Sequence, residues 1–272
     1  MKNALFGPRA LVLAGALLFS SALAQKGVGI APPRFELITP PASTLTETVD
    51  VFSRDLPDQM IDVAVVDWWI DPQGTVQELP RGANPFSAAS WLLVDSNPFN
   101  LTSNSAHPVR FSVAVPPGNG ALSGSYWTAI AFTTKPQPAK DANGMAVSVR
   151  TRVLAIIYVT IQGTEQPAAA LQGVSIQTGE SGQRYVIADV INKGNVYLRL
   201  NGELRFVNAK GEVIKRTALP ERVLLREGLV RYQLRVPADL PQDAVLAALE
   251  IQPQGPAKSD GGPPLYGEAN LR

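Results

Sequence analysis

Short apolar runs that alternate with polar residues are the feature that most restricts how this chain folds. Val109, Phe111, Val113 and Val115 occupy every second position, so they share one face of an extended strand. Similar runs recur about every 8 to 12 residues, a spacing typical of antiparallel sandwiches. We find no long apolar pattern with a helical period and caps. The predicted strands are 46–52, 61–70, 109–115, 126–134, 147–161, 183–191, 198–207, 212–216, 229–236 and 244–251.

The predicted strands fall into two groups, which indicates two tandem immunoglobulin-like β-sandwich domains. The first group covers residues 28–162 and the second covers 171–252, with a weaker segment from Gly163 to Ala170 as the linker. Residues 253–272 are rich in Gln, Gly, Pro, Lys, Ser and Asp up to Leu265. Such a composition buries too little apolar area to offset ordering, so we expect 253–272 to be a flexible tail.

The first 24 residues have the pattern of a secretory signal peptide. Lys2 and Arg9 precede an apolar run from Ala10 to Phe19, and Ala22-Leu23-Ala24 has the form of a cleavage site. The apolar run is about half the ~20 residues of a membrane span. We therefore expect export, with the mature protein in the periplasm or outside the cell. The alternative is an uncleaved anchoring helix.

The composition indicates a non-enzymatic protein. The 272 residues include no Cys and a single His. Disulfide frameworks, thiolate zinc sites, cysteine nucleophiles and His-dependent triads all need residues that are lacking. We also find no acid/base pair for a hydrolase. We therefore expect no cofactor and no small-molecule substrate.

The charge balance also argues against nucleic acid as a partner. The chain has 24 Lys plus Arg against 23 Asp plus Glu, and the basic residues form no block. A nucleic-acid surface requires a basic patch or stripe.

The residues that could carry chemistry do not form a recognisable site. His107 precedes a proline among Ser and Asn residues, which is turn composition. Asp62, Asp67 and Asp71 could suggest a calcium site, but the chain has no Asp-x-Asp-x-Asp-Gly loop. Asp62 and Asp67 also fall on opposite faces of the predicted strand. We therefore predict no catalytic residue and no metal site.

Two adjacent tryptophans provide a candidate contact surface. Trp68 and Trp69 are neighbours in a predicted strand, so they must point to opposite faces. One belongs to a core, and the other lies nearer the surface. An outward Trp can bind a partner, but the edge of a sandwich or a crevice between domains can also cover it.

Several arginines in the second group provide another candidate contact surface. Arg199 and Arg205, and then Arg231 and Arg235, have even spacings that align each pair on one strand face. A basic stripe of this kind could receive an acidic partner. The alternative is that these are solvated outward positions of a half-exposed sheet, since Glu203 shares that face.

An ordered series of short motifs in the first group carries a family resemblance. The motifs are Pro-Arg-Phe-Glu-Leu at 33–37, Val-Asp-Trp-Trp-Ile-Asp at 66–71, Trp-Leu-Leu-Val at 91–94, Asn-Pro-Phe-Asn-Leu at 97–101, Val-Arg-Phe at 109–111, Gly-Ser-Tyr-Trp at 124–127 and the run at 153–159. Their order and spacing resemble the N-terminal domain of PapD-like periplasmic pilus chaperones over residues 28–162. The series is also similar to immunoglobulin-like modules of bacterial surface proteins, including the WxL-interacting proteins of Gram-positive cells.

The chaperone resemblance implies how a partner is held. In that family a basic residue on the first strand and a Lys on the last strand of domain one grip the C-terminal carboxylate of a pilus subunit. Arg34 falls at the first of these positions. The second position falls near Leu154 or Ala155, which carry no charge, and Arg152 is the nearest basic substitute.

The resemblance also implies a pairing edge. In these chaperones the edge of the last strand pairs with a strand of the subunit, with main-chain hydrogen bonds and alternate side chains supplying the contact. Val147, Val149, Thr151 and Val153 alternate as such a strand requires. The alternative is an ordinary central or covered strand.

Two functional hypotheses follow. The first is an exported chaperone-like protein that binds secreted pilus or surface subunits by edge-strand pairing, with Arg34 and Arg152 as anchors. The second is a structural or adhesive cell-envelope module that binds a surface protein or polysaccharide. It would use Trp68 or Trp69 and the basic face of the second group.

Overall fold

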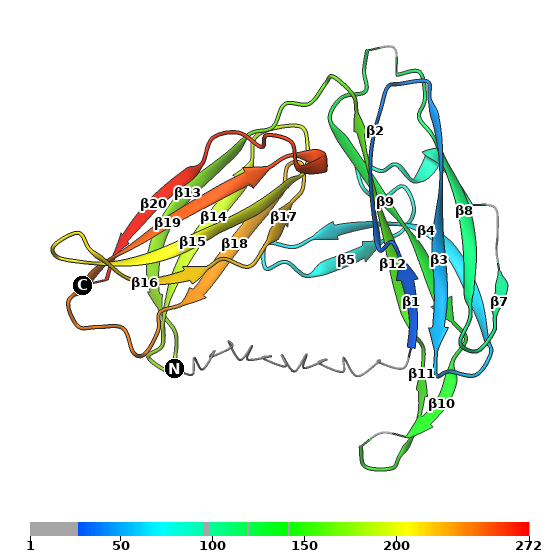
Figure 1. Ribbon diagram of the computed structural model, residues 1–272, viewed down its shortest axis with the longest axis horizontal. Coiled ribbons are helices and arrows are strands. Elements are labelled where there is room, and N and C mark those ends of the chain that lie inside the picture. The colour runs from blue at the N-terminus through cyan, green and yellow to red at the C-terminus, as the bar shows by residue number, and fades with distance from the viewer. Residues whose placement is uncertain (1–26, 95–97, 119, 141, 272) are drawn as a thin grey trace, which may run out of the picture.

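The chain forms two β-sandwiches that lie side by side (Figure 1). A computed structural model describes residues 27–94, 98–118, 120–140 and 142–271. The predicted signal peptide, 1–24, lies outside these residues. Within them almost all regular structure is strand, and no helix is long and apolar enough to cross a membrane. The prediction of an all-β chain with two immunoglobulin-like sandwiches is confirmed.

The first sandwich consists of two main sheets. One has the order β1 (Gly27–Ala31), β3 (Thr44–Arg54), β8 (Ala106–Ala114) and β6 (Leu92–Val94). The other has the order β2 (Arg34–Thr39), β12 (Arg152–Ile161), β9 (Ser125–Thr134), β4 (Gln59–Ile70) and β5 (Val76–Leu79), and β7 (Phe99–Leu101) pairs with β4. A short 3-10 turn, η1 (Ala89–Trp91), precedes β6.

Alternate residues of the two sheets meet in a single core, as the period of two predicts. Val109, Phe111 and Val113 of β8 are buried in it. The ring of Phe111 meets that of Phe35 edge to face, with 4.9 Å between centroids. Each buried aromatic or aliphatic side chain of this kind contributes roughly 1.5 to 3 kcal/mol.

A hairpin projects from the first sandwich between the end of β9 and the start of β12. Its strands are β10 (Gln137–Lys140) and β11 (Ala146–Val149), which pair antiparallel. In Figure 1 the hairpin extends beyond the rest of the first sandwich. It therefore places a short stretch of strand outside the main core.

The second sandwich also has two sheets. The first has the order β13 (Ala169–Thr178), β14 (Arg184–Asn192) and β18 (Leu229–Arg235). The second has the order β16 (Val213–Ala218), β15 (Leu198–Asn208), β19 (Ala244–Gln254) and β20 (Leu265–Asn270), and β17 (Arg222–Leu224) pairs with β15. Val186, Phe206 and Tyr232 are buried in the core between them.

The prediction of a flexible tail over 253–272 is wrong for the residues that the structure describes. β20 pairs antiparallel with β19, a 3-10 turn η2 (Pro256–Lys258) precedes it, and Leu271 is buried. The reason is that a backbone ladder and small side chains hold β20 in place. A Cβ atom on Gly267 would lie 2.5 Å from side-chain atoms of Leu171 and Val174, so glycine lets β20 approach β13.

An aromatic cluster packs the two sandwiches against each other. Trp68 and Trp127 of the first sandwich are buried in it together with Tyr197 of the second. The Trp127 Nε1–H donates a hydrogen bond of 2.9 Å to the carbonyl oxygen of Trp68. The rings of Tyr158 and Tyr197 stack across the junction, 4.1 Å apart. The junction is thus an apolar core of its own.

The turn between β4 and β5, at residues 71–74, also reaches the second sandwich. The Asp71 carboxylate accepts hydrogen bonds from the backbone N–H groups of Gln73 and Thr75. These bonds outweigh the effect of burial, and the pKa of Asp71 is lowered, with the backbone bond from Thr75 the largest cause. The Arg231 N–H donates to the Pro72 carbonyl oxygen at 2.7 Å. The turn thus contacts β18.

The backbones of the two sandwiches touch at Gly124. The Ser125 N–H donates to the Asn195 carbonyl oxygen at 2.9 Å. Gly124 has φ of +72°, and a Cβ atom there would lie 2.0 Å from the same oxygen. Both the conformation and the space therefore require glycine.

We expect Gly124→Ala to destabilise the protein more than a matched glycine substitution. Gly82 also has a positive φ, but its surroundings are open. Gly82→Ala should cost about 1 kcal/mol from the left-handed conformation alone. Gly124→Ala adds a backbone clash, for a total of about 3 kcal/mol. Urea unfolding of both variants tests this, and equal losses would contradict the proposed close approach.

Candidate functional site: an open strand edge beside the domain junction

One edge of the last strand of the first sandwich is only partly covered. On one side, β12 pairs with β9 from Arg152 to Thr160. On the other side, β2 pairs with β12 only from Ile156 onward, where Ile156 faces Arg34. In the part of the chain that the structure describes, no strand pairs with the outer edge of 146–155. This is the open edge.

Apolar side chains follow the open edge beyond the end of the core. Val153 packs against the first core and is half-buried, as is Thr151. Val149 is 48% exposed and Val147 is 38% exposed. Met145, in the turn before β11, is 65% exposed. Aliphatic side chains at this exposure are unusual on a strand edge and favour a covered state.

The open edge is bent where the hairpin leaves the sandwich. The sequence predicts one strand over 147–161, whereas the structure interrupts it at Arg150 and Thr151. Thr133 faces Arg152, and Gln137 faces Val149. The four steps from Thr133 to Gln137 therefore match only three steps from Val149 to Arg152. The β9 side of the ladder thus carries one extra residue. Such an insertion bends a ladder locally.

A pocket lies beside the bend. Its lining includes Leu56, Pro57 and Gln59 together with Val149 and Thr151 of the open edge. The pocket is mainly apolar in its lining. A side chain of a strand added to the open edge could pack into this pocket.

The structure does not bring the two predicted anchors together. Arg152 is the first residue of β12, whereas Arg34 of β2 faces Ile156, four residues further along β12. At about 3.3 Å per residue the two positions are roughly 13 Å apart along the strand.

Each anchor pairs with a carboxylate of the chain itself. The Arg152 guanidinium binds Glu78 with two hydrogen bonds, of 2.8 Å from Nε and 2.6 Å from Nη2. Arg34 Nε lies 2.8 Å from Glu36 Oε1. Both arginines are therefore already placed to hold a carboxylate.

A third arginine, which the sequence analysis did not assign to this site, meets the same carboxylate. Arg199 of β15 places Nη2 2.7 Å from Glu36 Oε1, and its side chain is only 8% exposed. Glu221 lies 3.2 Å from Nη1 of the same guanidinium. The only part of this cluster that the sequence could indicate is the pair Arg34 and Glu36, which share a strand face because they are two residues apart.

Burial and charge act in opposite directions on these groups. Burial alone raises the pKa of Glu36, but the hydrogen bond and charge of Arg199, with smaller effects of Tyr197 and Arg34, lower it overall. Burial raises the pKa of both Tyr158 and Tyr197 well above the ordinary value. The junction thus holds an ionised carboxylate beside two neutral phenols.

The basic stripe of the second sandwich is neutralised by acidic neighbours. Arg205 contacts Glu203 and Glu250 on the same sheet face. Arg231 binds Asp189 at 2.6 Å. For Arg205 and Arg231 the structure therefore favours the interpretation of outward positions balanced by acids over a free basic surface, whereas Arg199 is buried.

The tryptophan pair is not an exposed contact surface. Trp68 is 1% exposed within the aromatic cluster. Trp69 is half-buried and packs against Trp127, with ring centroids 5.6 Å apart. One Trp is in a core and the other lies nearer the surface, as predicted, but that core is the junction between the sandwiches.

The remaining candidate residues have structural roles. The His107 ring stacks on Phe99, 4.1 Å apart. Asp67 is buried and accepts hydrogen bonds from the Asn84 N–H and the Ser87 hydroxyl. Asp62 pairs with Lys135. Across the described ranges, no group of three or more His, Asp or Glu residues is placed to hold a metal ion.

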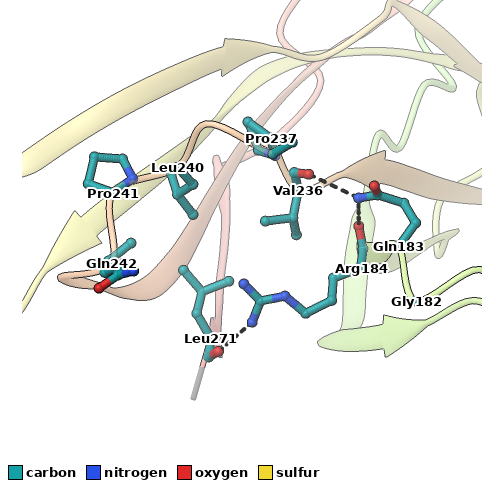
Figure 2. A pocket seen from close by; sticks show the side chains of 11 residues that line it. Gly182, Gln183, Arg184, Val236, Pro237, Leu240, Pro241, Gln242 and Leu271 are labelled. Carbon is teal, nitrogen blue, oxygen red and sulfur yellow. Dashed lines mark hydrogen bonds between the residues drawn. The ribbon is translucent and has the colours of Figure 1, made fainter.

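A separate pocket lies at the end of the second sandwich (Figure 2). Val236, Leu240 and Leu271 contribute apolar surface, and Arg184 is the charged residue among those that line it. The Arg184 guanidinium donates a hydrogen bond of 2.7 Å to the Leu271 carbonyl oxygen. In this way Arg184 ties β14 to the segment that follows β20.

The fold and the site together define a class: a two-domain protein of tandem immunoglobulin-like sandwiches with an open edge beside the junction. No protein-family model and no curated protein matches the chain.

Solved structures of fimbrial chaperones are similar to the chain. A chain of the chaperone–tip adhesin complex of CFA/I fimbriae is 12% identical, with a TM-score of 0.46 over 89% of this chain and 98% of that chain. The class 5 fimbriae chaperone CfaA is 12% identical, with a TM-score of 0.43 over 89% and 99%. The E. coli chaperone DraB is 14% identical, with a TM-score of 0.41 over 90% and 99%.

We expect the stability of the protein to depend on the charge of Glu36. Because folding lowers the pKa of Glu36, its contribution is present above the ordinary value of 4.5 and is lost as the pH falls through the lower folded value. The unfolding free energy of the wild type should therefore fall in this acidic range more than that of Glu36→Gln.

Urea unfolding at a series of pH values measures the difference between the two proteins. Glu268→Gln serves as the control, since Glu268 is exposed on β20 and has no salt bridge within the described residues. A gap between wild type and Glu36→Gln that stays constant from neutral to acidic pH would contradict the role given to Glu36.

Proposed function

We propose that this chain is an exported, non-enzymatic, chaperone-like protein that binds secreted pilus or surface subunits by edge-strand pairing. The observation that carries the proposal is the open edge at 146–155, with Val147 and Val149 exposed along it. Unpaired backbone groups on an edge are a template for a strand of another chain. Thr151 and Val153 would continue the contact into the first sandwich.

The direction of β2 suggests how the partner strand runs. β2 is parallel to β12, covers its edge from Ile156 onward and begins at Arg34. A subunit strand that fills the rest of this edge in the same direction would end next to Arg34. A C-terminal carboxylate would then meet the Arg34 guanidinium, which is 48% exposed.

Arg152 is proposed as the second anchor. It begins β12, within the open edge, and its side chain is 36% exposed. Its bonds to Glu78 hold the guanidinium beside the path of the added strand. From there it would contact polar groups of the partner rather than the terminal carboxylate at Arg34.

The proposed location is the periplasm or the exterior of the cell. The signal-peptide pattern of residues 1–24 supports export. The proposed activity is binding alone, so it needs no cofactor. An adhesive or structural envelope module is the alternative, but Trp68 is buried, and Arg205 and Arg231 are ion-paired.

We expect Val149→Asp to disrupt the proposed pairing. A charge on the apolar face of the edge opposes burial against a partner strand. Ser148→Asp is the matched control, since Ser148 is exposed and points to the opposite face of the same strand.

Co-purification with a secreted pilus or surface subunit that is co-expressed with this chain measures the effect. We expect Val149→Asp to lower recovery of the subunit at least about tenfold, equivalent to about 1.4 kcal/mol. Ser148→Asp should retain it. Equal recovery with both variants would contradict edge-strand pairing.

We expect the anchors to be required as well. Combined Arg34→Ala and Arg152→Ala substitutions should abolish co-purification of the subunit, because they remove the charges proposed to hold it. Arg150→Ala is a control, since Arg150 is exposed and belongs to neither anchor. Full recovery with the double variant would refute the assignment of the anchors.

A further inference from the structure

The Glu36 carboxylate is enclosed by donors from three separate elements. Arg34 of β2 and Arg199 of β15 both contact Oε1, at 2.8 and 2.7 Å. The other oxygen, Oε2, accepts a hydrogen bond of 3.2 Å from the Ala257 N–H of η2. Two domains therefore supply one set of donors for a single carboxylate.

The backbone around η2 adopts an unusual conformation to complete this set. Ala257 has φ of 50° and Lys258 has φ of 64°. Non-glycine residues rarely adopt the left-handed region, and the surrounding structure must enforce it. Here the result is a backbone N–H that points to Glu36 from the second domain.

Arg34 retains capacity for a second acceptor. It contacts Glu36 through Nε, and within the described residues its two Nη groups have no hydrogen-bond partner. A guanidinium can bind a carboxylate with two parallel hydrogen bonds. Arg34 is also the first residue of β2, where the open edge of β12 ends.

The charges at this position leave no surplus for an additional anion. Arg34 and Arg199 supply two positive charges, and Glu36 and Glu221 supply two negative charges. A further carboxylate would make the group net negative while it is partly buried, which is unfavourable. An incoming carboxylate is therefore better accommodated if Glu36 leaves than if Glu36 stays.

We propose that Arg34 and Arg199 form a two-arginine carboxylate site shared by the two domains, and that Glu36 occupies it until the terminal carboxylate of a bound polypeptide replaces it. This inference rests on the proposed function, because the open edge is what brings a chain terminus to Arg34. It assigns Arg199 of the second sandwich to the binding site. It also makes Glu36 a competitor that sets the affinity for a terminal carboxylate.

The test uses a synthetic ten-residue peptide of alternating Val and Thr with an N-terminal fluorophore, ending in either a free carboxylate or a carboxamide. Fluorescence anisotropy with the full chain gives the Kd of each form. Glu36→Gln should lower the Kd of the free acid at least tenfold and leave that of the amide unchanged. Glu268→Gln, which alters the net charge equally at an exposed position, should change neither.

Arg199 is tested by two variants because it is buried. Arg199→Gln should remove the preference for the acid over the amide, whereas Arg199→Lys, which keeps the charge, should retain part of it. The double variant Glu36→Gln/Arg199→Gln has the net charge of the wild type and should also lack the preference. An acid-to-amide ratio that Glu36→Gln leaves unchanged, or that Arg199→Gln leaves at the wild-type value, overturns the proposal.

The same titrations separate this inference from the proposed function. Equal binding of both peptides to the wild type, abolished by Val149→Asp, would keep edge-strand pairing and overturn the carboxylate site. Absence of binding of either peptide to the wild type and to Glu36→Gln would overturn both.

Discussion

β2 covers the edge of β12 only from Ile156 onward, and the arrangement of the proposed site depends on this partial cover. A full-length β2 would satisfy the backbone groups of 152–155 and leave no place for another strand. The chain passes from β1 in one sheet to β2 in the other just before Arg34. As a result, β2 covers only part of the outer edge of β12, and the rest of that edge is unpaired among the described residues. The same crossing puts Arg34 at the boundary between the covered and the uncovered edge.

The second sandwich contributes to that boundary through its fixed position. The Tyr158–Tyr197 stack, the buried Trp127 and the backbone contact at Gly124 all join the two sandwiches. This fixed arrangement brings Arg199 to the Glu36 carboxylate on β2. Burying the two charges costs desolvation energy, which their hydrogen bonds offset. The apolar junction and the ionic cluster are thus parts of one interface.

Each strand range predicted from local pattern contains a strand, because alternation is written in neighbouring residues. Local pattern missed β2 and β13, and it failed for β20, which is held by its backbone ladder with β19 and by Leu265 packed against the second core. It also failed for Arg199, which meets Glu36 across a separation of 163 residues. Such a contact depends on how two domains are set against each other, which periodicity does not encode. The exposure of Val147 and Val149 was anticipated only through the family resemblance.

The hairpin of β10 and β11 has a consequence for the protein on its own. An uncovered apolar strand edge can also join the same edge of another copy, which is a route to self-association and aggregation. Lys140 at the end of β10 and Arg150, which directly follows β11, are exposed. Two hairpins brought edge to edge would bring these like charges near one another, and their repulsion opposes the pairing. This repulsion would weaken self-association at low ionic strength, and added salt would screen it.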